Sequence, residues 1–215
     1  MDVLEAIKNR KSIRAFKQDP VSKELLVKLL EAAIWAPSGS NVQPWEFTVF
    51  QGKDKNRLVE AILEAAGQKN LASQPYEAPE EGLKRREKLF SIFAAKAAEL
   101  GKSIEKILLE GSFSFFNAPV VIMVTTKKAY GSARLADIGA SIQNLLLAAI
   151  EEGLGTCWIA LILAVEKEIK EYMGIPDNKR IVAGIAVGYP DLESPLNQFR
   201  SSRDDLDSFV RWFGF

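Results

Sequence analysis

Pro119-Val120-Val121-Ile122-Met123-Val124 is a nearly continuous apolar run near the middle of the chain. Such a run predicts a strand that is buried on both faces. Further strands are predicted at residues 47–49, 156–159 and 181–187, each next to a glycine-containing turn. Helical patterns alternate with these strands and outnumber them, and no repeat or interdomain linker divides the 215 residues. The sequence therefore predicts one α+β domain covering residues 1–215.

Apolar residues that recur with a helical period predict the helices. The strongest signal covers residues 134–152. The expected N-terminal caps are Asp2, Ser22, Asp54 and Ser103, since side-chain oxygens at this position accept backbone N–H groups. Shorter helices are predicted at residues 3–7, 22–36, 54–63, 84–100, 104–108 and 166–173.

Residues 67–116 differ in character from the rest of the chain. The first part, residues 67–82, contains prolines and small polar residues and predicts an irregular loop. Phe113, Phe115 and Phe116 crowd together at the other end, just before the buried strand. A helical insertion of this size that carries aromatic residues is typical of a lid or a packing arm.

The composition limits the possible chemistry. Lys plus Arg equals Asp plus Glu, 28 against 28, so no global charge favours nucleic acid or an anionic membrane. The chain has no histidine, which excludes His-based catalytic triads and His-containing zinc sites. Cys157 is the only cysteine, so no intrachain disulfide can form, and its apolar neighbours predict a buried, inert thiol. With no signal-peptide pattern and no membrane-spanning run, we expect a cytoplasmic protein.

The densest charge cluster is Arg10-Lys11-Ser12-Ile13-Arg14, directly after the first predicted helix. Three cations in five residues repel one another unless an anion or solvent compensates, and arginine matches phosphate oxygens bidentately. The alternative is a solvated helix end, where cations interact favourably with the helix dipole. The residue types alone leave these two interpretations equally open.

Other segments have equally ordinary explanations when they are taken alone. Residues 37–41 contain proline, serine, glycine and asparagine and form a good helix stop. Arg200 and Arg203 lie in a serine-rich loop that is typical of a solvated surface. Asp137 has no second carboxylate at a matching spacing, so a packing or hydrogen-bonding role is favoured over that of a general acid. No glycine-rich dinucleotide or nucleoside-triphosphate loop lies between a strand and a helix.

The motifs become specific when they are read together and in order. From near the N-terminus to the tail, their series resembles the nitroreductase family of FMN-dependent oxidoreductases. The motifs are RKSIRAF at residues 10–16, APSG at 36–39, NVQPW at 41–45, APVVI at 118–122, DIGA at 137–140, GLGTC at 153–157 and GYP at 188–190.

The resemblance implies an architecture. It implies a mainly antiparallel central sheet wrapped by helices, in an intertwined homodimer with FMN at the subunit interface. The apolar tail, with Trp212, Phe213 and Phe215, also suggests a covering partner subunit. Residues 67–116, including the three clustered phenylalanines, are the expected wall and lid of the acceptor pocket.

The resemblance also assigns cofactor-binding roles. Arg10, Lys11 and Ser12 would contact the phosphate and ribityl groups, and Arg14 the pyrimidine edge, where a guanidinium stabilises the negative charge of reduced flavin. Arg203 matches the family's second phosphate-binding arginine. Some members have a lysine where this chain has Ser201, so Arg200 is expected to substitute for it. The partner subunit would contribute Pro37, Ser38, Gly39 and Asn41, and one flavin face would be lined by Trp158, Ile159 and Ala160.

The implied activity is ping-pong hydride transfer from NADH or NADPH through flavin N5 to nitroaromatics, quinones or similar electron-poor acceptors. No catalytic side chain and no metal are expected, because the flavin carries the chemistry. Reductive dehalogenation and flavin fragmentation, both found in the same family, stay open as alternatives. A flavin-binding protein without turnover is a further alternative.

Overall fold

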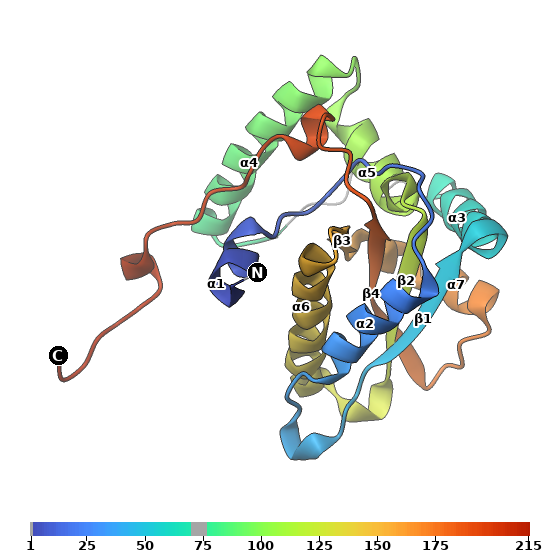
Figure 1. The fold of residues 1–215 in the computed structure, drawn as a ribbon, viewed down its shortest axis with the longest axis horizontal. Coiled ribbons are helices and arrows are strands. Elements are labelled where there is room, and N and C mark those ends of the chain that lie inside the picture. Colours follow the sequence, from blue (N-terminus) through green and yellow to red (C-terminus); the bar gives the residue numbers. More distant parts are fainter. Residues whose placement is uncertain (1, 70–76) are drawn as a thin grey trace.

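A four-stranded antiparallel sheet forms the centre of the molecule, with strand order β1-β2-β4-β3 (Figure 1). The computed structural model describes residues 2–69 and 77–215. The strands are β1 (Glu46–Gln51), β2 (Val120–Lys127), β3 (Gly155–Ile159) and β4 (Lys179–Gly188). This arrangement confirms the predicted α+β class and the mainly antiparallel sheet.

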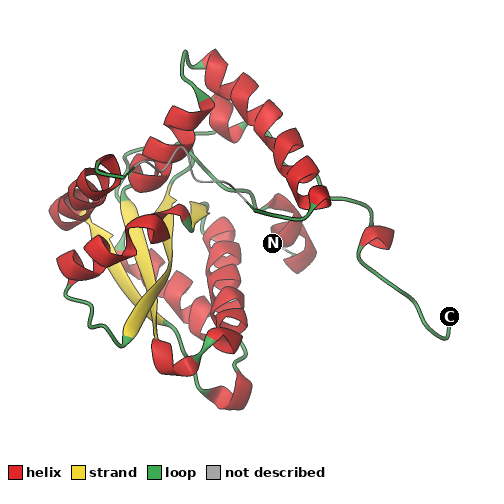
Figure 2. Cartoon of the chain, turned by 180° about the vertical axis from the view of Figure 1, so that it is seen from behind, coloured by secondary structure: helices red, strands yellow, loops and turns green. Residues whose placement is uncertain are grey.

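Helices cover both faces of the sheet (Figures 1 and 2). One apolar cluster joins the sheet to α2 and α6, and a second joins it to α3, α5 and α7. The long α4 adds Phe93 and Ala97 to the second cluster, whereas the N-terminal helix lies outside both clusters. The helices are α1 (Val3–Asn9), α2 (Lys23–Ile34), α3 (Gly52–Gly67), α4 (Glu80–Glu99), α5 (Ile104–Phe113), α6 (Leu135–Glu151) and α7 (Glu166–Met173).

Strand β2 is buried on both faces, as its continuous apolar sequence predicts. Val121 and Met123 pack into the cluster with α3, α5 and α7. Val120, Ile122 and Val124 point the other way, toward α2 and α6. Side chains alternate along a strand, so an all-apolar run satisfies two cores at once.

The helix caps agree with expectation at two serines. Ser22 accepts the Leu25 N–H at 3.3 Å, and Ser103 accepts the Lys106 N–H at 3.2 Å. Asp2 occupies the cap position of α1, but its side chain makes no capping hydrogen bond.

The prediction that Asp54 caps the third helix is wrong. Helix α3 begins two residues earlier, at Gly52, which adopts a left-handed backbone with φ of 61°. A left-handed conformation suits glycine, and it turns the chain directly from β1 into α3. Asp54 therefore lies in the first turn of the helix, where its charge favours the helix dipole.

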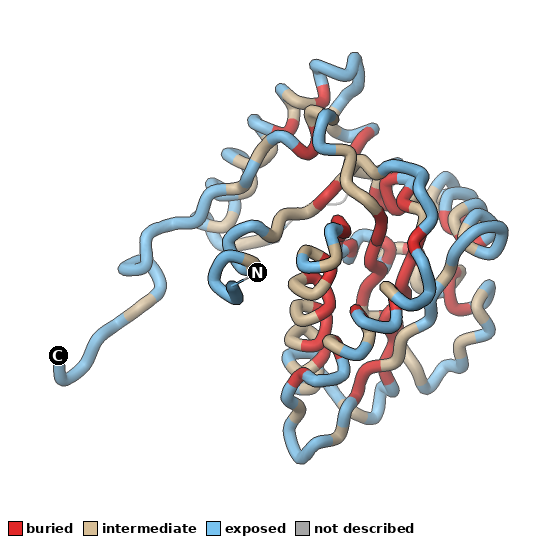
Figure 3. Tube along the Cα trace, in the orientation of Figure 1, coloured by how far each residue is buried: buried red, intermediate tan, exposed pale blue. Residues whose placement is uncertain are grey.

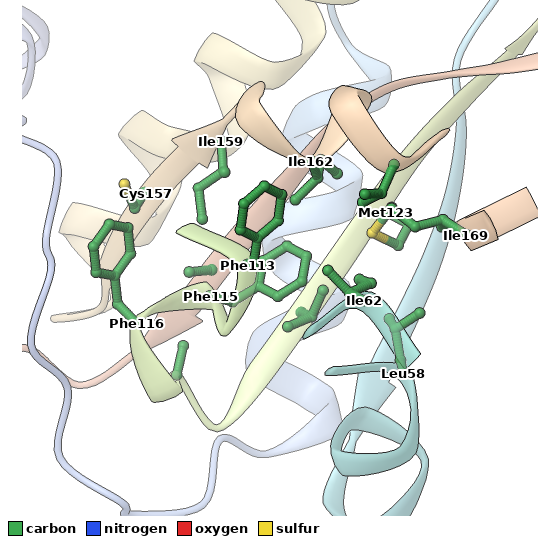
Figure 4. Close-up of a cluster of buried hydrophobic side chains, with 14 of the residues drawn as sticks. Leu58, Ile62, Phe113, Phe115, Phe116, Met123, Cys157, Ile159, Ile162 and Ile169 are labelled. Atoms are coloured by element: carbon green, nitrogen blue, oxygen red, sulfur yellow. The ribbon is translucent and has the colours of Figure 1, made fainter. Parts of the chain in front are cut away.

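The helical character expected for residues 84–108 is confirmed by α4 and α5, and residues 70–76 of the expected loop lie outside the described residues. The clustered phenylalanines contribute to the core, and their predicted place in the wall of an acceptor pocket stays a prediction. Phe113, Phe115 and Phe116 are buried among side chains of α3, β2 and β3 (Figure 4), so their main role is in the core. Phe115, Phe116 and Asn117 form a rare left-handed turn, with φ of 51°, 52° and 56°, that directs the rings inward.

The C-terminal segment extends away from the sheet after β4 and passes along α4 (Figure 1). Only Leu206–Ser208 forms a short 3₁₀ turn within the amphipathic segment expected at residues 205–213. Most residues of this segment are exposed (Figure 3), with Phe213 at 84%, and Phe215 beyond it is 99% exposed. None of the described helices is long and apolar enough to cross a membrane.

The close contact between β4 and the left-handed turn gives a stability prediction. A methyl group at Gly184 would meet the ring of Phe115 and lie 2.9 Å from Cδ1 of Ile162. We expect Gly184→Ala to lower the free energy of unfolding by about 1–3 kcal/mol through overpacking, measured by urea denaturation. Gly67→Ala is the matched control, because among the described residues no atom outside its own helix lies within 4 Å of the added methyl group. A Gly184→Ala protein as stable as the parent would contradict this account of the core.

Candidate functional site

The cationic run is fixed to the outer edge of the sheet. The Ile13 N–H donates to the Thr156 carbonyl at 2.9 Å, and Ser12 forms a parallel bridge with the same residue of β3. The contact requires a glycine on the neighbouring strand, because a methyl group at Gly155 would lie 2.7 Å from Cγ1 of Ile13. Residues 10–14 therefore have a defined place beside β3.

Asn197 joins this run to the C-terminal segment. Its side chain is 1% exposed and accepts the Arg14 N–H at 2.8 Å. The same amide donates to the carbonyls of Ala15 at 2.8 Å and Asp191 at 2.7 Å. Its own carbonyl accepts a hydrogen bond from the Lys11 ammonium. This buried residue brings together two parts of the chain that are more than 180 residues apart.

Cations from both segments line one cavity of about 760 Å³. Its charged residues come from two parts of the chain, the end of α1 with the segment that follows it, including Lys8, and the loop that follows Asn197. Leu89, Gln143 and Phe199 add an apolar and amide surface to it. The predicted cofactor residues that line it are Arg10, Lys11, Ser12, Arg14, Arg200 and Arg203.

The cations in this cavity disfavour one another. Burial, together with the nearby positive charges of Arg203 and Arg200, lowers the pKa of Arg10. Burial and the charge of Arg200 also lower the pKa of Lys11. A bound anion would relieve this repulsion, so the electrostatics fit a phosphate group.

Backbone carbonyls and a serine hydroxyl hold the two C-terminal arginines. Arg200 donates to the Asn9 carbonyl at 2.7 Å, which closes the C-terminal loop over the end of α1. Arg203 donates to the Ser201 hydroxyl at 3.0 Å and the Ser202 carbonyl at 2.9 Å. Because these partners are neutral, both guanidinium groups keep their net charge for a ligand.

Cys157 lies next to the cationic run but faces the core. It is 3% exposed, and burial raises the pKa of its thiol. A thiol with a raised pKa is a poor nucleophile, which confirms the expected buried thiol. Within residues 2–69 and 77–215, no group of three or more Cys, Asp or Glu residues could hold a metal ion.

The turn at residues 37–41 lies away from this cavity in the single chain. It follows α2 and precedes β1, and none of its residues lines the cavity. Asp137 accepts the Gly39 N–H at 3.2 Å and pairs with Arg134 at 3.1 Å, which confirms its hydrogen-bonding role. Ser40 and Asn41 adopt left-handed backbones, with φ of 54° and 55°. The turn thus has a defined conformation on an exposed surface. Its contact with a cofactor stays a prediction.

The third predicted segment also lies outside the cavity lining. Trp158 is 41% exposed, Ala160 is exposed, and Ile159 is buried in the core. The partly exposed ring of Trp158 therefore lies beside Gly139 of α6. The side chain of Ile159 has a packing role, and only its backbone could face a ligand.

Sequence analysis missed Asn197, Phe93 and Phe199. Asn197 is a single amide in a polar loop, and its partners are mostly backbone groups that sequence does not reveal. Phe93 follows the ordinary apolar period of α4, yet its ring lies 5.1 Å from the Arg14 guanidinium. A helix-period pattern predicts burial but does not predict a cation as the neighbour.

Proteins with similar sequences identify the family of this chain. The model of the Nitroreductase family matches residues 7–189. The loop with Asn197, Arg200 and Arg203 lies beyond this match, so its place in the cavity comes from the structure. The chain is 30% identical to a 4-nitrobenzoate reductase of Pseudomonas putida, over 97% of this chain and 94% of that protein. It is 32% identical to a 4-nitrobenzoate reductase of Nocardioides sp. (strain LMS-CY), over 95% and 87%.

Solved structures agree in fold. The FMN and NADPH-dependent nitroreductase NfnB from Sphigopyxis sp. strain HMH superimposes with a TM-score of 0.89 at 28% identity, over 100% of both chains. The FMN-dependent nitroreductase NfnB from Mycobacterium smegmatis, in complex with NADPH, gives a TM-score of 0.86 at 30% identity, over 99% of this chain and 100% of that one.

The lowered pKa of Lys11 predicts a pH dependence for anion binding. Lys11 loses its proton at a lower pH than an ordinary lysine, so phosphate affinity should fall as pH rises through that value. As the pH is raised toward 10.5, the ordinary pKa of lysine, we expect a loss of up to about fivefold, the worth of one charge contact in water. Titration calorimetry with inorganic phosphate measures this, with Lys11→Arg as the control, since arginine stays charged. An equal loss in Lys11→Arg would show that another group titrates.

Proposed function

This chain belongs to the nitroreductase family, and we propose that it is an FMN-dependent oxidoreductase that uses NAD(P)H to reduce electron-poor acceptors. The acceptors proposed are nitroaromatic compounds, quinones or similar molecules. Its relatives support this, because they are named as 4-nitrobenzoate reductases and as FMN- and NADPH-dependent nitroreductases. The observation that carries the proposal is the convergence of six cations from two distant segments on one cavity.

The residues in the cavity suit FMN. A phosphate monoester is a dianion near neutral pH, and the mutual repulsion of Arg10, Arg200 and Arg203 favours such a ligand. We assign the phosphate to these three arginines together with Lys11, and the ribityl chain to the hydroxyl of Ser12. The cavity of about 760 Å³ lies within the range usual for cofactor sites.

Arg14 has a separate task. It lines the same cavity as Arg10. In the chain, however, it follows Ile13, whose N–H bonds to β3, whereas Arg10 precedes Ile13. We assign it to the pyrimidine edge of the flavin ring, where a fixed positive charge stabilises the negative charge of the reduced ring. Bound flavin supplies hydride transfer, and the chain supplies binding, orientation and charge.

The set of cavity residues explains how an enzyme without histidine could work. The ionisable groups that line the cavity are all cations, so none of them is suited to act as a general base while it stays protonated. The side chains therefore bind anions and position a ring, and protons come from water. This division of labour favours a redox enzyme over a hydrolase.

We also propose that the active form is a homodimer. Exposed apolar side chains support it, because Trp35 at the end of α2 is 85% exposed and Phe213 and Phe215 of the tail are almost fully exposed. Such a surface is costly to leave in water. The turn at residues 37–41 lies next to Trp35, so a dimer that covers this surface could bring the turn to the partner's cavity. Trp158 and Ala160, which are exposed in the single chain, would meet the flavin from the other side.

An acceptor panel tests the function. FMN-loaded protein should lose its flavin absorbance when NADH or NADPH is added without oxygen, and should regain it on addition of 4-nitrobenzoate or a quinone. Steady-state rates with both nicotinamides and a panel of nitroaromatics then rank the acceptors. Flavin that stays oxidised with both nicotinamides would contradict the proposal and favour a flavin-binding protein without turnover. Rapid reduction without turnover of any nitro compound or quinone would contradict the acceptor class.

Sedimentation velocity tests the dimer. We expect the parent chain to sediment as a dimer at micromolar concentration, because burying an aromatic side chain contributes about 1.5–3 kcal/mol. Trp35→Glu, or a stop before Leu206, should shift the equilibrium toward monomer. Lys17→Glu is the control, since Lys17 is exposed and outside the proposed contacts. A parent chain that is monomeric with and without FMN would contradict the proposal.

A further inference from the structure

The guanidinium of Arg14 lies against two aromatic rings. Its central carbon is 5.1 Å from the ring centroid of Phe93 and 5.9 Å from that of Phe116. Both separations are within the range of cation–π attraction, in which the negative face of a ring attracts a positive charge. The rings come from α4 and from the left-handed turn before β2, so two separate elements meet at this one cation.

Arg14 lacks the partner that usually fixes an arginine. Among the described residues no carboxylate lies within 4.0 Å of its guanidinium, and its side chain makes only a weak contact of 3.4 Å with the Ser12 carbonyl. A carboxylate would hold the side chain but would also cancel its field. Aromatic rings attract the cation without contributing a net charge.

Both rings are themselves fixed. Phe93 is 2% exposed, and Phe199 packs edge-on against it, with centroids 5.4 Å apart and an interplanar angle of 80°. Phe116 is 8% exposed, and its ring lies so close to Gly111 that a methyl group there would be 2.6 Å from Cε1. Rings packed in this way offer Arg14 a rigid surface rather than a mobile one.

The left-handed turn that carries Phe116 has an unfavourable backbone conformation. Phe116 has φ of 52° and lies between two further residues with positive φ. Such a conformation is unfavourable for residues other than glycine, because the Cβ atom approaches the following carbonyl oxygen. Strain of this kind persists where the surrounding structure requires it and is often found near functional sites. Figure 4 shows the ring of Phe116 at one end of the cluster, next to Cys157 and apart from the rings of Phe113 and Phe115.

We propose that Phe93 and Phe116 are positioning residues that hold the Arg14 guanidinium in place by cation–π contact and thereby set the reduction potential of the bound flavin. This inference rests on the proposed function, since it takes Arg14 to lie at the pyrimidine edge. A fixed, uncancelled cation stabilises the reduced form more than the oxidised form and so raises the potential. If the rings are removed, the side chain is free to move toward solvent and the potential falls.

The test is the two-electron reduction potential of FMN-loaded protein, measured by equilibration with reference dyes. Phe93→Leu and Phe116→Leu should each weaken the preference for reduced over oxidised flavin by about threefold to tenfold. For a two-electron couple this is a fall of about 15–30 mV. Phe116→Tyr keeps the ring face, so it should keep the parent potential.

Two controls make the result specific. Phe113→Leu removes a similarly buried ring that is not one of the two rings against Arg14, and should leave the potential unchanged. Arg14→Gln should lower the potential by at least as much as the phenylalanine variants. In the Arg14→Gln background, Phe93→Leu should then have no further effect, because it acts through the guanidinium.

Each contrary outcome has a distinct meaning. Unchanged potential in Arg14→Gln would overturn the assignment of Arg14 in the proposed function. A shift in Arg14→Gln but none beyond the Phe113→Leu control in the phenylalanine variants would overturn only the positioning role. A Phe93→Leu shift that persists in the Arg14→Gln background would also overturn it, since the ring would then act without the cation.

Discussion

The cavity depends on the buried hydrogen bonds of Asn197. Its side-chain amide accepts the Arg14 N–H and donates to two carbonyls. Its backbone carbonyl accepts a hydrogen bond from the Lys11 ammonium. Buried polar groups are costly when unpaired, so this set of bonds allows little choice in how the two segments meet. Arg200 and Arg203 follow within six residues of Asn197 and therefore arrive opposite Arg10. The anion site is a consequence of this junction.

Folding brings several positive charges close together, and their mutual repulsion opposes it. The pKa values of Arg10 and Lys11 are lowered, which means that the chain gathers positive charges at a cost to its own stability. The two apolar cores on either side of the sheet, and the attachment of Ile13 to β3, supply the compensation. An anionic cofactor recovers the cost on binding, so cofactor affinity and chain stability are linked. Arg14 likewise keeps its positive charge for a ligand, because aromatic rings rather than a carboxylate hold its guanidinium.

Much of the fold could be predicted from local patterns. The all-apolar run of β2, the period of α6 and the serine caps each depend on a few neighbouring residues, and each is confirmed. The cap at Asp54 could not be predicted correctly, because the left-handed backbone of Gly52 decides where α3 begins. The sequence predicts that the phenylalanine cluster lines a pocket wall. The orientation of its rings depends on a left-handed turn, which no pattern of residue types reveals. The charge cluster at residues 10–14 is visible in the sequence, but only the family resemblance connects it, together with Arg200 and Arg203, to a cofactor. Asn197 could not be found, because its partners are backbone atoms far along the chain.

The most direct test of this account is the FMN dissociation constant of Asn197→Ala, measured by flavin fluorescence on protein that is folded by circular dichroism. Gln198→Ala is the matched control, since its amide bonds only to the nearby Glu193 carbonyl on the surface. Loss of the buried amide should weaken FMN binding by about tenfold to a hundredfold, because both cationic segments lose their common anchor. An Asn197→Ala protein that is folded and binds FMN as tightly as the Gln198→Ala control would contradict the account.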